Sequence, residues 1–432
     1  MTNLNVSLAL ATATRLATVG TFEMLKLETL RQKTLWVFLA ISGFVSIEPS
    51  PYEFILPIVI LAFARGGMLF DKTIAPLVVT LTLYDAGGLL ALTPFVHETE
   101  SVAFILISIY ITVTVVVLAA IVAASPITRM ETIRSGYIVA GLIAASLGIL
   151  GYFNVAGLGP YFTLYDNSRA MGAFKDPNVF GPFLVPPIVW LTQDILLRRA
   201  RPVGAVVKLI VLLLGVFLSF SRGAIIDWVF STVLLLGLTF LTTPSRSERT
   251  RTVVVAVVGA VLVACLLAIV LAIPTVRELA FERASLAEDY DSGVQGRFGN
   301  QLRSIPLLLE LPFGFGPLRF GHIFPQDPHE VFVSAFASFG WLGGLAFFVF
   351  VAVTLYYGWM LTFQRSPLQP QVVALWSALL PQIVQGIQID TGHWSHLFLM
   401  CGCLYGLAGA MRRERLAAAP SRIPAAPVPR TA

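Results

Sequence analysis

The sequence predicts an all-α polytopic membrane protein with about twelve transmembrane helices. Charged residues make up 12% and hydrophobic residues 56% of its 432 residues, whereas soluble proteins average about 25% and 45–50%. The mean hydropathy is +0.82, and apolar runs of about 17–25 residues are interpreted as bilayer-crossing helices. One long polar segment, residues 274–330, interrupts these runs.

Each apolar run is interpreted as one span, because long unbroken runs do not fit the short alternating segments of an outer-membrane barrel. The first two runs are short and are compatible with one tight hairpin. The spans are expected near residues 34–48, 52–64, 73–93, 102–124, 136–153, 179–197, 205–220, 223–241, 252–273, 331–361, 371–389 and 394–411.

The distribution of basic residues predicts the orientation. With both termini in the cytoplasm, most of the 29 Lys and Arg residues fall in inner loops and ends, a strong positive-inside bias. We therefore expect residues 1–33 to be a cytoplasmic amphipathic or disordered leader and 412–432 a disordered cytoplasmic tail. The 274–330 loop then faces outward, to the periplasm in a Gram-negative host. The net charge of +5 follows from this topology and does not indicate nucleic-acid binding.

Positive charge on the outer side, where topology disfavours it, requires a reason. Arginines at helix ends can reach lipid phosphates, or guanidinium forks can hold an anionic ligand bidentately. All five histidines also map to the outer side or to outer helix ends. The outer basic residues are Arg169, Lys175, Arg222, Arg277, Arg283, Arg297, Arg303 and Arg319.

Two short segments place some of these cations beside helix starts. The first, residues 172–181, reads Gly-Ala-Phe-Lys-Asp-Pro-Asn-Val-Phe-Gly; its Asp-Pro-Asn suits a turn with Asp176 or Asn178 as a cap, which alone would explain it. The second, residues 219–224, joins two spans with almost no loop and puts Arg222 at the joint. Small neighbours there allow a ligand to approach the backbone, although a structural ion pair is the alternative.

The polar loop itself predicts two surface helices, at 277–289 and 296–310, followed by a break at Pro312–Pro317. Arg297 and Gln301 share a helix face one turn apart, whereas Arg303 points elsewhere. His329 follows Asp-Pro and opens the next span. A histidine there, near several arginines, is placed to act as a proton acceptor.

A metal or other cofactor is not expected. His393 and His396 have a spacing compatible with a metal pair, but Asp390 is their sole nearby carboxylate. No phosphate-binding Gly-Lys-Ser loop, zinc-protease signature or nucleophile elbow occurs in the chain.

Taken in this order on this topology, the motifs resemble those of the bacterial O-antigen ligase and polymerase family. The resemblance covers about residues 34–411. It rests on Arg169 with residues 172–178, on Ser221-Arg222-Gly223, on Gly296-Arg297-Phe298 leading to residues 312–316, and on Pro328-His329-Glu330 followed by residues 339–343. The family commonly has asparagine after the histidine, where this chain has Glu330.

The resemblance implies a metal-independent, inverting glycosyltransferase of the GT-C type in the bacterial inner membrane. Its domain would span residues 34–411, with 274–330 as a periplasmic catalytic loop. The donor would be a glycan on undecaprenyl diphosphate, and the acceptor a sugar hydroxyl of lipid A–core or another lipid-linked glycan. Carried onto this chain, the catalytic residues are His329, Arg222 and Arg297. The expected substrate-binding residues are Arg169, Lys175, Asn178, Gln301, Arg303 and Glu330.

Three alternatives stay open at this point. The first is a polymerase of the same family, which these motifs do not separate from the ligase. The second is a lipid-linked glycan transporter, in which a carboxylate within the spans, Asp85 or Asp227, would be essential and His329 dispensable. The third is a membrane scaffold without a reaction, which leaves the outer arginines and histidines without a cause.

Overall fold

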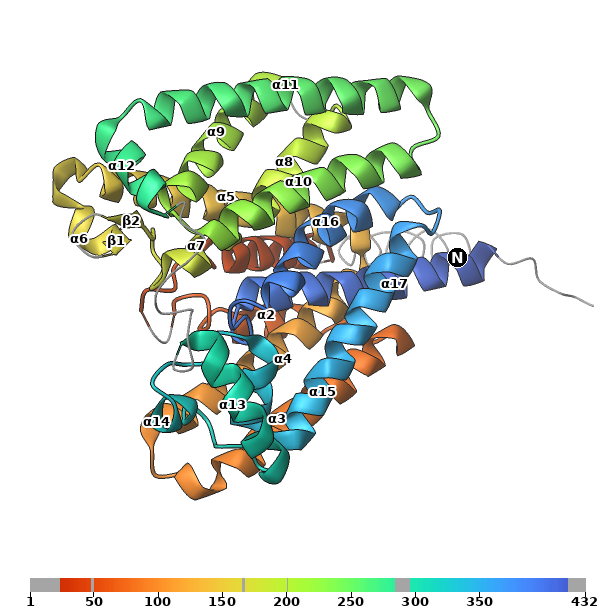
Figure 1. Ribbon diagram of the computed structural model, residues 1–432. Coiled ribbons are helices and arrows are strands. Elements are labelled where there is room, and N and C mark those ends of the chain that lie inside the picture. Colours follow the sequence, from red (N-terminus) through yellow and green to blue (C-terminus); the bar gives the residue numbers. More distant parts are fainter. Residues whose placement is uncertain (1–23, 48–49, 165–167, 200, 284–295, 419–432) are drawn as a thin grey trace, which may run out of the picture.

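The structure, a computed structural model, describes residues 24–47, 50–164, 168–199, 201–283 and 296–418, and it is almost entirely helical (Figure 1). A first helix covers residues 24–40. The later elements are α2 (Leu56–Phe63), a 3-10 turn (Lys72–Ile74), α3 (Ala75–Leu92), a 3-10 turn (Thr93–Phe95), α4 (Thr99–Ala124), α5 (Pro126–Tyr152), a 3-10 turn (Val155–Gly157), α6 (Gly159–Phe162), β1 (Thr163–Leu164), β2 (Arg169–Ala170), α7 (Pro177–Phe183), α8 (Val185–Leu196), α9 (Pro202–Leu218), α10 (Arg222–Thr242), α11 (Arg246–Leu271), α12 (Pro274–Arg283), α13 (Arg297–Glu310), α14 (Phe320–Ile323), α15 (Val331–Thr362), α16 (Gln369–Gln385) and α17 (Ser395–Ala418).

The predicted all-α polytopic membrane protein is confirmed. Within the described residues, seven helical segments are long and apolar enough to cross a membrane, and α9 is apolar but shorter. Helix α2 has eight residues, which gives a length of about 12 Å, too short to span a bilayer core of about 30 Å. The expectation of about twelve spans therefore stays a prediction. The seven segments are Lys72–Phe95, Thr99–Ala124, Pro126–Tyr152, Pro177–Leu196, Arg222–Thr242, Arg246–Leu271 and Val331–Thr362.

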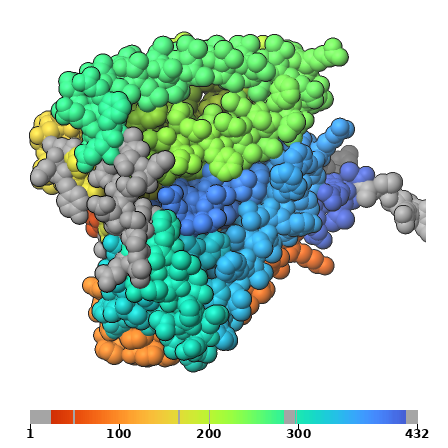
Figure 2. Space-filling model, viewed as in Figure 1, coloured from red at the N-terminus to blue at the C-terminus, as the bar shows by residue number. Residues whose placement is uncertain are grey.

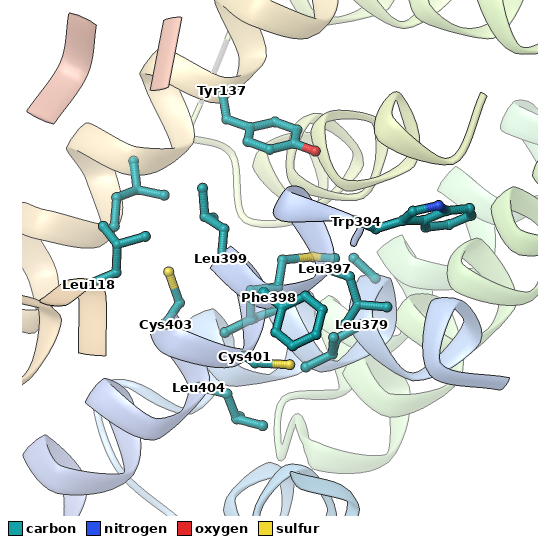
Figure 3. Close-up of a cluster of buried hydrophobic side chains, with 14 of the residues drawn as sticks. Leu118, Tyr137, Leu379, Trp394, Leu397, Phe398, Leu399, Cys401, Cys403 and Leu404 are labelled. Atoms are coloured by element: carbon teal, nitrogen blue, oxygen red, sulfur yellow. The ribbon is translucent and has the colours of Figure 1, made fainter. Parts of the chain in front are cut away.

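The core of the bundle surrounds α17, which packs along α4. A Cβ added to Gly402 would lie 2.7 Å from the Val115 carbonyl oxygen, and one added to Gly406 would lie 2.7 Å from that of Ala119. The two glycines therefore allow close backbone contact between the helices, as small residues do in membrane bundles. Figure 3 shows that Cys401 and Cys403 point to different sides of α17, each among apolar side chains.

Helix α11 lies along one edge of the molecule (Figures 1 and 2). Within its most apolar window 6% of the residues are buried inside the protein, compared with 78% for α7–α8. Its exposed surface consists mainly of valine, leucine and alanine side chains. A helix this apolar and this exposed is suited to direct contact with lipid.

The structure shifts several expected boundaries. The first helix begins at residue 24, inside the segment expected as a leader, and residues 1–23 lie outside the described part. Helix α16 ends at Gln385 rather than 389, because Gly386 and the residues after it form turns. Helix α17 continues to Ala418, into the expected tail, of which residues 419–432 are not described.

Candidate active site at one end of the helix bundle

The expected site residues belong to helix ends and loops that gather at one side of the bundle. Helices α7, α10 and α15 start there, and α9 and α16 end there. In Figure 1 this side, with α6, α12 and α14, is toward the left. The contacts described below join these ends into one assembly.

Arg169 joins two of the sequence motifs. It lies in β2 with 9% of its surface exposed. Its Nε donates to the Ser219 carbonyl over 2.8 Å, and its Nη2 donates to Asn178 Oδ1 over 2.9 Å. Asp176 caps α7 by accepting the Asn178 N–H over 2.8 Å. Arg169 and Asn178 therefore fasten the start of α7 to the junction between α9 and α10.

The α9–α10 junction is a tight turn built from residues 219–222. Phe220 has a left-handed φ of 46°, and Ser221 Oγ caps α10 by accepting the Ala224 N–H over 3.3 Å. Arg222 is the first residue of α10 and is partly exposed. The helix N-terminus adds partial positive charge to that of the guanidinium, so this position favours an anion such as a phosphate.

Residues 385–392, which we call the outer strap after the side on which the sequence predicts them, run from the last residue of α16 toward α17 and contact both the Arg222 junction and the start of α15. On one side, a Cβ added to Gly223 would collide with Gln385 Nε2. On the other, the Gly386 carbonyl accepts the Val331 N–H over 2.9 Å. The outer strap therefore holds the starts of α10 and α15 in one neighbourhood.

His329 stands directly at this start of α15, two residues before Val331. It is exposed, and its φ of 46° is in the left-handed region. A non-glycine residue there stores strain of about 1–3 kcal/mol, which persists when the surroundings enforce it. Such strain is typical of functional positions. Here it occurs at an exposed histidine directly before the N-cap residue of a helix.

Glu330 caps α15 and thereby fixes the residue after His329. Its carboxylate accepts the N–H groups of Phe332 over 2.9 Å and of Val333 over 2.6 Å. Burial raises the pKa of Glu330; the two N–H donors oppose this effect, and the charge of Asp390 in the outer strap reinforces it. Asp390 itself accepts the Ser334 hydroxyl and the Gly392 N–H. The carboxyl groups of Glu330 and Asp390 therefore both lie at the first turn of α15, next to His329.

Helix α13 confirms the helix predicted at 296–310, and it contacts the same turn. Gln301 donates from Nε2 to the Pro328 carbonyl, directly before His329. Arg303 is exposed, donates to Asn300 Oδ1 over 2.5 Å and lies over the Phe324 ring. Arg297 is the first residue of α13, one turn before Gln301, but its side chain lies outside the described part.

The predicted break at Pro312–Pro317 docks onto a kink in α15. At Gly340 the helix adopts φ 64° and ψ −169°, so nearby backbone groups lose their helical partners. The Ala337 carbonyl accepts the Phe315 and Gly316 N–H groups over 2.8 and 3.0 Å, and the Trp341 N–H donates to the Pro312 carbonyl over 2.9 Å. Two glycine motifs distant in sequence thus complete each other's hydrogen bonds.

Part of this region lies within the segment of the chain that matches a known family. Residues 207–348 match the family model described as O-antigen ligase. This match supports the resemblance of the chain to the O-antigen ligase and polymerase family. No curated protein matches the chain.

The matched segment runs from α9 into α15 and includes Arg222, Arg297 and His329. Arg169, Lys175 and the outer strap lie outside it. Lys175 is exposed in the turn before α7. Arg169 and Asn178 bind one another, and Arg169 also binds the Ser219 carbonyl, three residues before Arg222. A substrate contact by either residue stays a prediction.

The outer strap was not anticipated by the motif analysis. The polarity of residues 382–390 could have indicated it. They include three glutamines and Asp390 at the end of an expected span, and polar residues at membrane depth are frequently functional. His393 and His396, by contrast, pack on aromatic rings. The ring centroids of His393 and Phe104 are 4.2 Å apart, and those of His396 and Trp394 are 5.2 Å apart.

Proposed function

We propose that the protein is a glycosyltransferase that moves a glycan from undecaprenyl diphosphate to a sugar hydroxyl of lipid A–core on the periplasmic face of the inner membrane. The match of residues 207–348 to the O-antigen ligase family model supports this class of reaction. The observation that carries the proposal is the outer strap, because it contacts both Gly223, next to Arg222, and Val331, two residues after His329. These contacts support the assignment of Arg222, as an anion-binding group, and His329, as a base, to one site.

The reaction is a direct displacement at the anomeric carbon. His329 accepts the proton of the attacking hydroxyl. The hydroxyl oxygen bonds to the anomeric carbon on the face opposite the diphosphate, so the configuration inverts. The bond to the diphosphate oxygen breaks, and that oxygen keeps the electron pair.

Arg222 and Arg297 neutralise the charge that develops on the leaving diphosphate. Fixed cations at a developing charge act more strongly in a dry site than in water. The first turn of α10 adds its N–H dipoles to Arg222. The prenyl chain of the donor stays in the membrane among the helices, and transfer takes place at the level of the helix ends. Both termini of the protein are in the cytoplasm in this proposal.

The direct test is transfer by the purified protein from a defined lipid-diphosphate donor to two acceptors, lipid A–core and a second lipid-linked glycan. We expect transfer to lipid A–core and its loss in Arg222→Ala. Arg277→Ala is the matched control, because Arg277 is an exposed arginine in α12, and it should keep native activity. Failure of the native protein to transfer to either acceptor, while the donor stays intact, would refute the proposal.

A polymerase of the same family is the second candidate, and the same assay separates the two. Elongation of the lipid-linked glycan without transfer to lipid A–core identifies a polymerase. In cells, loss of the gene should leave lipid A–core without any O-chain for a ligase, and lipid A–core with a single repeat for a polymerase.

The transporter alternative is tested through buried carboxylates. Asp85 accepts the Ser108 hydroxyl over 2.7 Å, and Asp227 accepts the Ser231 hydroxyl over 3.4 Å. Both bonds are internal to the bundle, and so we expect Asp85→Asn and Asp227→Asn to retain transfer in correctly folded protein. A transporter requires the opposite pattern, with one of these carboxylates essential and His329 dispensable.

A further inference from the structure

Gln385, the last residue of α16, is a polar group at the site that the family motifs do not include. Its Nε2 occupies the space that a side chain at position 223 would fill. The amide therefore lies over the first turn of α10, next to Arg222. Its own successor, Gly386, binds the start of α15 through the Val331 N–H. The side chain is thus placed between the diphosphate-binding and the proton-accepting halves of the proposed site.

The amide oxygen of Gln385 is buried and has no hydrogen-bond partner among the described residues. A buried acceptor left unpaired costs about 1–3 kcal/mol, so this oxygen lacks a donor that the described residues do not supply. The side chain as a whole is only partly buried, which leaves an approach from outside.

Other buried glutamines with an unpartnered amide oxygen are in different surroundings. Gln193, near the C-terminal end of α8, donates its amide to the carbonyl of Pro370 at the N-terminal end of α16, the end far from Gln385. Gln382 donates to the Pro182 carbonyl over 2.9 Å, deeper in the bundle. Among these, Gln385 is the one whose amide adjoins Arg222.

We propose that Gln385 binds the donor glycan by accepting a hydrogen bond from a hydroxyl or amide N–H of the sugar attached to the diphosphate. This inference rests on the proposed function. The anomeric carbon lies between the leaving diphosphate and the attacking hydroxyl, so a group between Arg222 and His329 faces that first sugar. Amide side chains suit this task because they donate and accept in one plane.

Gly223 has a matching role as the residue that makes room for this amide. In Gly223→Ala the new methyl group collides with the flexible end of Gln385, so the amide moves while the helices stay in place. The two substitutions should therefore act through one cause. Gly237 provides the matched control in α10, because a Cβ there meets nothing within 4 Å.

The test is a double-mutant cycle on donor KM with full-length protein in detergent, using Gln385→Ala, Gly223→Ala and their combination. Each single variant should raise the donor KM about tenfold, as loss of one hydrogen bond implies, with the acceptor KM unchanged. The double variant should be no worse than either single one. Gly237→Ala should match the native protein.

A donor series identifies the bonded atom. Donors that lack one hydroxyl, or one acetamido group, of the first sugar are compared with the full donor in the native protein and in Gln385→Ala. One deletion should raise the native KM about tenfold and have no effect in Gln385→Ala. Additive effects in the cycle, or an unchanged KM in Gln385→Ala while Arg222→Ala is inactive, overturn the role of Gln385 and leave the proposed function intact. Absence of transfer by the native protein is instead a failure of the proposed function.

Discussion

Gln301 binds the carbonyl of Pro328 through its side-chain amide. This contact links the first turns of α13, where Arg297 is located, to the residue before His329. A helix expected to contact the diphosphate is therefore attached to the turn that presents the proposed base. The position of His329 depends on this attachment as well as on its own helix.

Gln301→Ala should lower turnover by about ten- to a hundredfold, because small misplacements of a reacting group are costly. The donor KM should stay close to native if the main role of Gln301 is its bond to the Pro328 carbonyl; a raised donor KM would instead support the predicted substrate contact of Gln301. Steady-state transfer kinetics measure both quantities. Leu302→Ala is the control, as its side chain is 71% exposed on the same helix. Equal losses in the two variants contradict a specific role for Gln301.

Glu330 gives the fold a pH dependence that its glutamine variant should lack. Its raised pKa means that the folded state holds the proton more tightly than the unfolded state, so Glu330 lowers the stability of the fold as pH rises from about 4.5, the ordinary value. The melting temperature of Glu330→Gln minus that of the native protein should therefore increase between pH 4.5 and the raised pKa of Glu330, and it should be constant above that pKa. A constant or decreasing difference contradicts the raised pKa.

Gly340→Ala should detach the 312–316 segment from α15. The added Cβ would lie 2.6 Å from the Pro312 carbonyl oxygen, at a φ of +64°, and the backbone conformation alone costs about 1–3 kcal/mol for a residue with a side chain. We expect a lower melting temperature and faster proteolysis within residues 296–316. Gly237→Ala, in open space within α10, should keep or slightly raise the melting temperature. Native protection of the loop in Gly340→Ala would show that the docking is not needed.

Arg169→Met should destabilise the α9–α10 junction, because it leaves the Ser219 carbonyl and Asn178 Oδ1 without their shared donor. The expected loss is about 1–3 kcal/mol for each unpaired group, and transfer should fall with it. Asn178→Asp keeps an acceptor for Arg169 and should be tolerated, whereas Asn178→Leu should not. Thermal unfolding with parallel transfer assays distinguishes these outcomes; if Arg169→Met is stable but inactive, Arg169 contacts substrate.

Local sequence patterns predicted the parts of this structure that depend on local physics. Apolar length identified the helices, helix periodicity identified α13, and the Pro-Gly pattern identified the break after it. The start of α15 directly after His329 was also expected. These features arise from interactions within a few residues, which the sequence displays directly.

The contacts that assemble the site were not predictable in this way. Arg169 meets Ser219 fifty residues away, and the Gly386 carbonyl meets Val331 across two helices. In the sequence, a polar side chain beside a turn has the same appearance whether it binds a ligand or a backbone carbonyl. Only the fold separates Arg169, which binds the junction, from Gln301, which binds the His329 turn.

The central claim is that His329 accepts the proton during glycan transfer, and the most direct test measures donor binding and single-turnover transfer on the same preparations. The variants are His329→Ala and, as control, His322→Ala, an exposed histidine in α14. We predict that His329→Ala binds the lipid-diphosphate donor with native affinity and transfers at least about a hundredfold more slowly, while His322→Ala is native in both. Full transfer by His329→Ala would contradict the account.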